Sequence, residues 1–191
     1  DLAIEASMTK LYERNEIGVR TEYVRDSTLA SELSQTGVVQ ENRQRARTSV
    51  NPSWTTQLSE RASVQLGYDF AQIKYEDAAG TGLTDYRTES PYGVFSYRLS
   101  ERSSLQTLTG MSQLRRAGGG SVRDIYAQTL LESRLTEVLK AKVGVGLSHI
   151  RSDSTLAKDA KAGWLAQASI ERTFLTGTLA MGLARENNPT G

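Results

Sequence analysis

The chain has 191 residues, a length that suits one compact domain or one membrane barrel, and its 23 Lys and Arg residues nearly balance its 22 Asp and Glu residues. The formal net charge of +1 gives no global electropositive field, so nucleic acid is not an expected partner. Cysteine is absent, which excludes thiolate metal sites, disulfides and cysteine nucleophiles. No apolar run approaches the roughly 18 residues of a membrane helix and mean hydropathy is −0.45, which excludes a helical membrane protein.

Apolar and polar residues alternate with a period of two along most of the chain, and this pattern predicts β-strands. After Arg61, for example, Val64, Leu66 and Tyr68 share one parity, and polar or small residues fill the other. The runs exceed the roughly five or six residues of a globular strand and reach the roughly 9 to 11 that a tilted strand needs to cross a bilayer. In chain order, the ten predicted strands are 2–11, 15–25, 42–58, 62–76, 85–99, 103–115, 123–135, 139–151, 162–171 and 174–185.

Two prolines and the first strand depart from this simple alternation. Pro52 and Pro91 fall inside predicted strands. Because proline lacks a backbone donor and is confined to edges or bulges of sheets, we interpret both as bulges. In the first strand, the apolar residues from Leu2 to Met8 have the opposite parity from Leu11, which leaves open the face to which that strand contributes them.

A tetrapeptide recurs where predicted strands meet: Leu-Tyr-Glu-Arg at 11–14, Leu-Ser-Glu-Arg at 58–61 and 99–102, and Leu-Thr-Glu-Val at 135–138. Its copies start 47, 41 and 36 residues apart, and the apolar parity continues through each copy. Each copy therefore predicts a tight hairpin turn between two strands that share an apolar face. Residues 171–174, Glu-Arg-Thr-Phe, predict a fifth turn, although the parity around it differs by one residue.

The segment 57–68 joins Gln-Leu-Ser-Glu-Arg to Val-Gln-Leu-Gly-Tyr, and the segment 97–105 reads Tyr-Arg-Leu-Ser-Glu-Arg-Ser-Ser-Leu. Together they resemble a broad group of Gram-negative outer-membrane β-barrels, over most of the chain. The resemblance implies an all-β fold, an antiparallel up-and-down transmembrane β-barrel in the bacterial outer membrane. It implies no functional residue, because proteins with different roles share this turn. A soluble all-β sandwich is the main alternative fold.

In such barrels the periplasmic turns are short and the extracellular loops are longer, which would place the tetrapeptides on the periplasmic side. Both chain ends would then lie outside the cell, whereas complete barrels of this type keep both ends in the periplasm. We therefore expect residues 1–191 to be a single β-barrel domain that lacks terminal strands, as part of a barrel of twelve or more. The predicted outward segments are 26–41, 77–84, 116–122, 152–161 and 186 onward.

Arginines gather near the predicted outer rim. Arg47 lies eleven residues before Leu58, about 36 Å along a strand, so its cluster belongs to the outer end. Guanidinium groups bind phosphate and carboxylate in a bidentate way, which predicts a mouth for anionic solutes or a contact with lipopolysaccharide phosphates. The alternative is a rim neutralised by carboxylates such as Glu41, Glu76 and Asp77. The predicted rim residues are Arg43, Arg45, Arg47, Arg115, Arg116 and Arg123.

The face opposite the apolar one carries charges of both signs and predicts a wet lumen. These side chains either fill a narrow barrel as an ion-pair network or line a selective aqueous path, because the width of the lumen depends on the total number of strands. The predicted lumen residues are Arg20, Glu22, Asp69, Arg98, Glu132, Arg134, Lys140 and Lys142.

Catalytic chemistry finds little support in the sequence. His149 is the only histidine, and Ser148, Ser152 and Asp153 lie near it, so a Ser-His-Asp arrangement has to be considered. However, His149 shares the parity of Leu147, which points it toward lipid. One histidine and no cysteine leave only carboxylates for a metal, and no calcium-loop pattern occurs. We expect no catalytic residue, no metal site and no cofactor.

The architecture leads to three candidate functions. The first is a channel or a transport or export conduit with a polar lumen. The second is a structural or interaction barrel with a plugged lumen that binds lipid or a partner protein, and the third is an outer-membrane hydrolase. Outer-membrane lipids and lipopolysaccharide are expected partners in each case.

Overall fold

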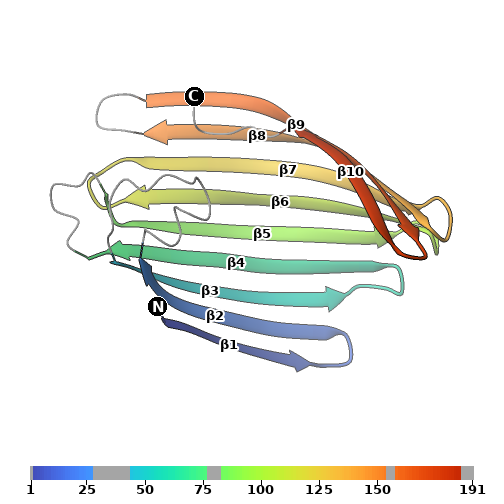
Figure 1. The fold of residues 1–191 in the computed structure, drawn as a ribbon, viewed down its shortest axis with the longest axis horizontal. Coiled ribbons are helices and arrows are strands. Elements are labelled where there is room, and N and C mark those ends of the chain that lie inside the picture. Colours follow the sequence, from blue (N-terminus) through green and yellow to red (C-terminus); the bar gives the residue numbers. More distant parts are fainter. Residues whose placement is uncertain (1, 28–43, 77–82, 154–157, 186–191) are drawn as a thin grey trace.

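The computed structural model describes residues 2–27, 44–76, 83–153 and 158–185. Within them, the chain forms a single antiparallel sheet in which each strand pairs with its neighbours in sequence (Figure 1). This confirms the predicted all-β, up-and-down architecture. The strands are β1 (Leu2–Leu11), β2 (Asn15–Ser27), β3 (Gln44–Gln57), β4 (Ala62–Tyr75), β5 (Tyr86–Arg98), β6 (Ser103–Arg116), β7 (Ser121–Arg134), β8 (Leu139–Asp153), β9 (Lys158–Phe174) and β10 (Gly177–Arg185).

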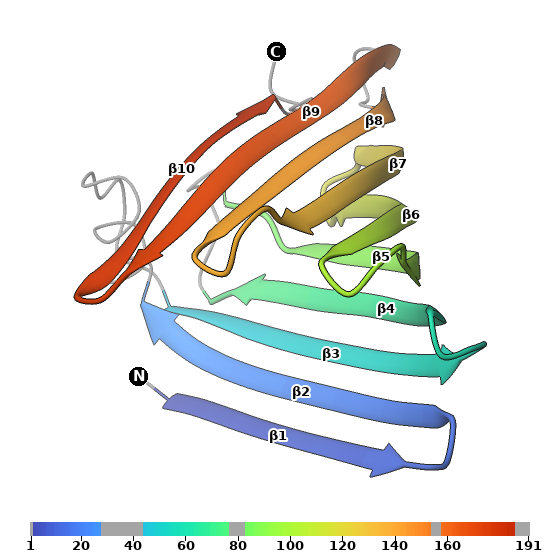
Figure 2. The same ribbon diagram turned by 90° about the vertical axis from the view of Figure 1, so that its right-hand side faces the viewer.

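The sheet curves into an open trough with β1 and β10 at its two edges (Figure 2). In the described part of the chain no pairing joins these two edge strands, so the ten strands do not close into a barrel by themselves. That the chain is part of a barrel of twelve or more strands stays a prediction. The described residues include no helix that is long and apolar enough to cross a membrane.

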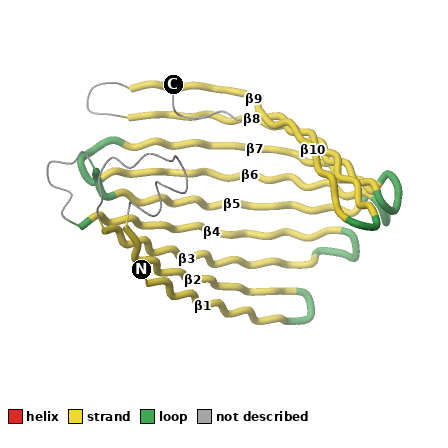
Figure 3. The backbone as a smooth tube through the Cα atoms, in the orientation of Figure 1, coloured by secondary structure: helices red, strands yellow, loops and turns green. Residues whose placement is uncertain are grey.

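The two ends of the sheet differ in their connections (Figure 3). At one end, called the turn end here, successive strands are joined by residues 12–14, 58–61, 99–102, 135–138 and 175–176. At the opposite end, the loop end, the connections include the longer segments 28–43 and 76–85. Strand β1 starts and strand β10 finishes at the loop end, because Leu2 pairs with Arg25 and Arg185 pairs with Ala166.

The repeated tetrapeptide has a structural reason. In the turn 58–61, the backbone N–H groups of Leu58 and Ser59 both donate to the carbonyl of Ala62, and the Ser59 hydroxyl oxygen accepts from the N–H of Ala62 at 3.1 Å. The turns 99–102 and 135–138 repeat this backbone pattern. The short hydroxyl side chain in the second position therefore closes the turn.

The last residue of each tetrapeptide also connects neighbouring hairpins. The carbonyl of Arg61 accepts from the N–H of Arg98, and the carbonyl of Arg102 accepts from the N–H of Arg134, each at 2.7 Å. The carbonyl of Val138 likewise accepts from Thr173 at 2.8 Å. Successive turns are therefore bonded to one another along the turn end.

Three details of the sequence interpretation change. The predicted fifth turn at 171–174 is wrong: β9 continues to Phe174, which pairs with Gly177, so the turn is 175–176. The bulges at Pro52 and Pro91 are also wrong, because the register is the same on both sides of each proline. At each proline, the backbone pairing with one neighbouring strand is interrupted: with β4 at Pro52 and with β6 at Pro91.

The pairing register assigns each strand residue to one of two faces. On the outer face, large apolar side chains stay exposed, for example Trp54 (40 %) and Leu147 (69 %). The opposite face holds the buried Ser49 and Ser148, as expected on the concave side, where side chains converge. We call it the inner face. The open question about β1 is resolved, because Leu2, Ile4, Ala6 and Met8 pair with outer-face residues of β2.

Candidate functional site

Polar side chains follow a line across the middle of the inner face. The Asn51 amide donates to the Asp69 carboxylate at 2.8 Å, and the Ser90 hydroxyl donates to Ser112 at 3.1 Å. These two bonds lie beside the prolines, where the backbone ladder lapses. Further along the same line, the Ser148 hydroxyl donates to Asp124 at 2.8 Å, and Arg20 pairs in register with Asn51. The inner face therefore presents a belt of donors and acceptors to the space inside the trough.

Two tyrosines lie against glycines in the next inner-face row. Tyr92 pairs with Gly67, and a Cβ on Gly67 would lie 2.3 Å from the Tyr92 Cζ. Tyr126 pairs with Gly110, and a Cβ there would lie 2.7 Å from the Tyr126 hydroxyl. Real Cβ atoms essentially never lie so close to another atom, so a side chain at either position would require the tyrosine to move. At Gly110 the Cβ would also meet the Pro91 carbonyl oxygen at 2.9 Å. Each ring thus lies along the wall, over the glycine of the neighbouring strand.

A groove of about 480 Å³ follows the inner face of β1 to β5 beside this belt. Its lining is mostly polar and includes the charged groups of Glu16, Arg20 and Asp69 together with Asn51 and the Tyr92 ring. A hydrophilic molecule would find both charge signs and several hydroxyl and amide groups there.

All eight predicted lumen residues lie on the inner face by register. Some of them are ion-paired: Lys142 contacts Glu132 at 2.9 Å, Lys140 contacts Glu171 at 3.5 Å, and Arg20 contacts Glu5 at 3.4 Å. The sequence could not indicate these partners, which come from neighbouring strands. The ion pairs follow the wall between adjacent strands, so they do not by themselves close the lumen.

The predicted arginine rim is divided by the register. Arg45, Arg47 and Arg116 belong to the inner face, whereas Arg115 and Arg123 belong to the outer, apolar face. The register thus divides the predicted rim residues between the two faces, because adjacent residues of a strand point to opposite faces. Their binding of anionic solutes or lipopolysaccharide stays a prediction. The predicted rim residue Arg43 and the suggested partners Glu41 and Asp77 lie outside the described residues.

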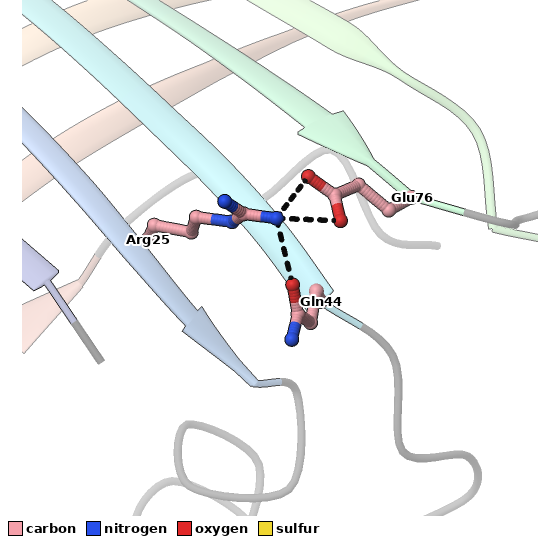
Figure 4. Close-up of polar contacts among 3 residues, drawn as sticks. All are labelled: Arg25, Gln44 and Glu76. Atoms are coloured by element: carbon pink, nitrogen blue, oxygen red, sulfur yellow. Dashed lines mark hydrogen bonds and ion pairs between the residues drawn. The ribbon is translucent and has the colours of Figure 1, made fainter.

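The predicted rim residue Arg45 on β3, and Arg25 on β2, have carboxylate partners. Arg45 donates through Nε and Nη2 to both oxygens of Asp26, each at 2.8 Å. On the outer face, Arg25 donates to both Glu76 oxygens, at 2.8 and 2.9 Å, and to Gln44 at 2.9 Å (Figure 4). In this part of the loop end, carboxylates of the chain itself therefore neutralise the arginines.

The residues considered for a hydrolase are separated in the structure. Ser148 lies on the inner face, bonded to Asp124, whereas His149 pairs with Ile125 on the outer face. Consecutive strand residues cannot both reach one cleft on one face.

The sequence analysis missed the contacts of Tyr92 with Gly67 and of Tyr126 with Gly110, because each glycine lies next to its tyrosine only after the strands are paired. It also missed Arg87 and Arg151, which come beside Arg115 and Arg123 only when the strands are paired.

Comparison with known proteins yields structural matches only. No family model and no curated protein matches the chain significantly. Among solved structures, the outer-membrane protein OmpT of Vibrio cholerae matches with a TM-score of 0.64 at 9% identity, over 95% of this chain and 55% of that chain. A Pseudomonas aeruginosa FadL homologue matches with a TM-score of 0.54 at 8% identity, over 94% of this chain and 59% of that one.

The Pseudomonas putida toluene transporter TodX also matches, with a TM-score of 0.54 at 9% identity, over 95% of this chain and 66% of that one. The chain thus spans less than two thirds of the length of these structures. At such identities the likeness shows the fold alone, which is that of outer-membrane β-barrels. With its exposed apolar outer face, this fold assigns the chain to the bacterial outer membrane.

Proposed function

We propose that this chain forms part of the wall of an outer-membrane channel or transport conduit, within a single barrel of twelve or more strands. The main support is the arrangement of Tyr92 over Gly67 and of Tyr126 over Gly110. Rings that lie along the wall coat it with hydroxyl groups and leave the space in front of it to water. Because short turns face the periplasm in such barrels, the proposal takes the loop end as extracellular.

The chemistry of the belt favours hydrophilic solutes. The Asp69 and Asp124 carboxylates, the Arg20 guanidinium and the tyrosine hydroxyls can replace part of the hydration of a passing solute. The solved structures with this fold include a toluene transporter, which agrees with a transport role. We propose no catalytic role, because Ser148 and His149 lie on opposite faces.

Single-channel conductance of the full-length protein in planar bilayers tests this proposal. We expect the wild-type protein to conduct ions. In the Gly67→Ala variant, the three atoms nearest the new Cβ all belong to the Tyr92 side chain, so it forces that ring off the wall and into the path. In Gly110→Ala, the new Cβ displaces Tyr126 and also presses on the Pro91 carbonyl oxygen. Each variant should therefore lower the conductance, by roughly twofold, because the displaced ring narrows the path.

The matched control is Gly93→Ala, next to Tyr92 in the same strand. Gly93 lies on the outer face, and a Cβ there would meet Leu66 Cδ2 at an ordinary 3.4 Å. Its conductance should equal that of the wild-type protein. A folded wild-type protein that does not conduct would contradict the proposal and favour a plugged barrel with a structural or binding role.

A further inference from the structure

Four arginines lie side by side on the outer face at the loop end of β5 to β8. Arg87 pairs directly with Arg115, and Arg123 pairs directly with Arg151. We call these four residues the outer arginine patch. With strands about 4.8 Å apart, it extends roughly 14 Å across the sheet, which is wide enough for more than one phosphate group.

The patch stores unfavourable electrostatic energy. Like charges in direct cross-strand pairs destabilise a sheet, and here two such pairs lie next to each other. Arg87 contacts Glu89 at 3.3 Å, and Arg115 donates to the neutral amide of Gln113 at 3.1 Å. Within the described part of the chain, the other three patch arginines form no ion pair with a carboxylate.

At the same end of the sheet, on β2 to β4, an outer-face arginine has its charge balanced within the chain. There Arg25, also on the outer face, is held by both oxygens of Glu76 and by Gln44 (Figure 4). The chain thus supplies a carboxylate and an amide for a lone outer arginine, whereas the four patch arginines share a single carboxylate contact, that of Arg87 with Glu89. Guanidinium groups bind phosphate in a bidentate way, so an external phosphorylated group would balance the patch charge.

The surroundings of the patch indicate what carries that group. A groove of about 330 Å³ at this end is lined by Arg87, Arg115 and Arg116, with Gln72, Tyr86, Ala117 and Asp85. The Asp85 carboxylate is already engaged, because it accepts the backbone N–H of Tyr75 at 2.9 Å. Toward the turn end, the outer face becomes apolar, with Ile125 (50 % exposed) and then Leu147 (69 %). A ligand with phosphate at one end and hydrocarbon at the other matches this order of charge and apolar surface.

The opposite end of the same strands lacks such charge. On the outer face of β5 to β8, the residues nearest the turn end are Tyr97, Ser103, Ser133 and Leu139, none of which is charged. On these four strands the basic surface therefore marks only one boundary of the apolar face. A lipid confined to one leaflet accounts for this asymmetry better than a soluble anion, which would need no apolar surface.

We propose that the outer arginine patch binds the phosphorylated headgroup of lipopolysaccharide in the outer leaflet, with the acyl chains along the apolar outer face. The proposal shares with the channel proposal only the assumption that the loop end is extracellular. It concerns the lipid-facing surface, so either proposal can fail while the other holds.

Binding of purified lipopolysaccharide to the full-length protein in detergent tests this inference. Wild-type protein is compared with Arg87→Gln/Arg115→Gln, Arg123→Gln/Arg151→Gln and the quadruple variant. We expect each double variant to weaken binding at least about tenfold, because charge-assisted hydrogen bonds to phosphate are lost. Glutamine also removes the repulsion between arginines, so these variants should fold; the gel mobility of unheated samples checks this.

The matched control is Arg45→Gln/Arg47→Gln, which removes equal charge at the loop end from the inner face, at residues that do not line the groove. It should bind lipopolysaccharide like the wild-type protein. Equal binding by the quadruple variant, or equal weakening in the control, would overturn the proposal. So would undiminished binding of dephosphorylated lipopolysaccharide, which would indicate acyl packing only. Inorganic phosphate that binds as tightly as the lipid would indicate a free-phosphate site instead.

Discussion

The inner and outer faces of the same strands use similar residues for different purposes. Arg115 and Arg116 are adjacent in β6, yet one lies in a basic patch facing lipid and the other faces the lumen. Val64 faces outward, whereas Val94, on the neighbouring strand, faces inward beside Gln65. Residue type therefore does not define a site in this sheet. The parity within a strand, combined with the register between strands, defines it.

The largest effect should come from placing a charge on each face. We expect Val64→Arg, two residues into β4 from the turn end, to destabilise the protein in a lipid bilayer by about 1–2 kcal/mol, because the guanidinium must enter hydrocarbon near its boundary. Val94→Arg should cost less than about 1 kcal/mol, because the inner face is wet. Denaturant unfolding in lipid vesicles measures both. Equal costs would show that the two faces have the same surroundings and would remove the distinction between them.

A smaller effect is expected from removing charge on each face. Near the turn end of the inner face, Lys140 and Lys142 are ion-paired, so Arg98 and Arg134 supply the excess positive charge. We expect Arg98→Gln/Arg134→Gln to reduce the anion-to-cation permeability ratio by about threefold, because the local field that concentrates anions is weakened. The reversal potential in a salt gradient gives this ratio.

The outer-face variant Arg123→Gln/Arg151→Gln is the control for that measurement, since it removes the same charge from the lipid side. Its permeability ratio should equal that of the wild-type protein. An equal shift in both variants would mean that the measurement senses total surface charge. An unchanged ratio in Arg98→Gln/Arg134→Gln would place the turn-end mouth outside the ion path.

The strand pattern was predictable because its signal is local. Alternation of side chains needs only neighbouring residues, and the tetrapeptides indicate turns directly. The end of β9 was predicted less well, because its turn at Leu175 and Thr176 has no tetrapeptide. The prolines were misread for another reason: Pro52 and Pro91 break one ladder without adding a residue, and an interrupted ladder is invisible without the partner strand.

The candidate sites depend on register, which couples residues that are far apart in sequence. Parity counted from the tetrapeptides could have put Arg87 and Arg151 on the apolar face, since Arg87 shares the parity of Leu99 and Arg151 that of Leu135. Their adjacency to Arg115 and Arg123 could not be counted in this way. The Tyr92 ring over Gly67 likewise requires both the pairing and the ring orientation.

The smallest difference between the faces should come from hydroxyl pairs that bridge strands. Thr107 and Thr129 lie 3.2 Å apart at their hydroxyl oxygens on the outer face, and Ser90 donates to Ser112 at 3.1 Å on the inner face. Replacing both members of a buried polar pair with apolar groups of similar shape is neutral or stabilising. On a face covered by lipid, the two hydroxyls also have no water with which to form hydrogen bonds. We therefore expect Thr107→Val/Thr129→Val to stabilise the protein by about 0.5 kcal/mol.

The inner pair should respond in the opposite direction. Ser90→Ala/Ser112→Ala removes a hydrogen bond from a wet wall beside Pro91, where the backbone ladder has already lapsed, so we expect a loss of about 0.5 kcal/mol. Unfolding in lipid vesicles, with the two double variants measured side by side, gives both signs. A common sign for the two pairs would mean that hydroxyl bonding depends on strand pairing alone and not on whether water or lipid covers the face.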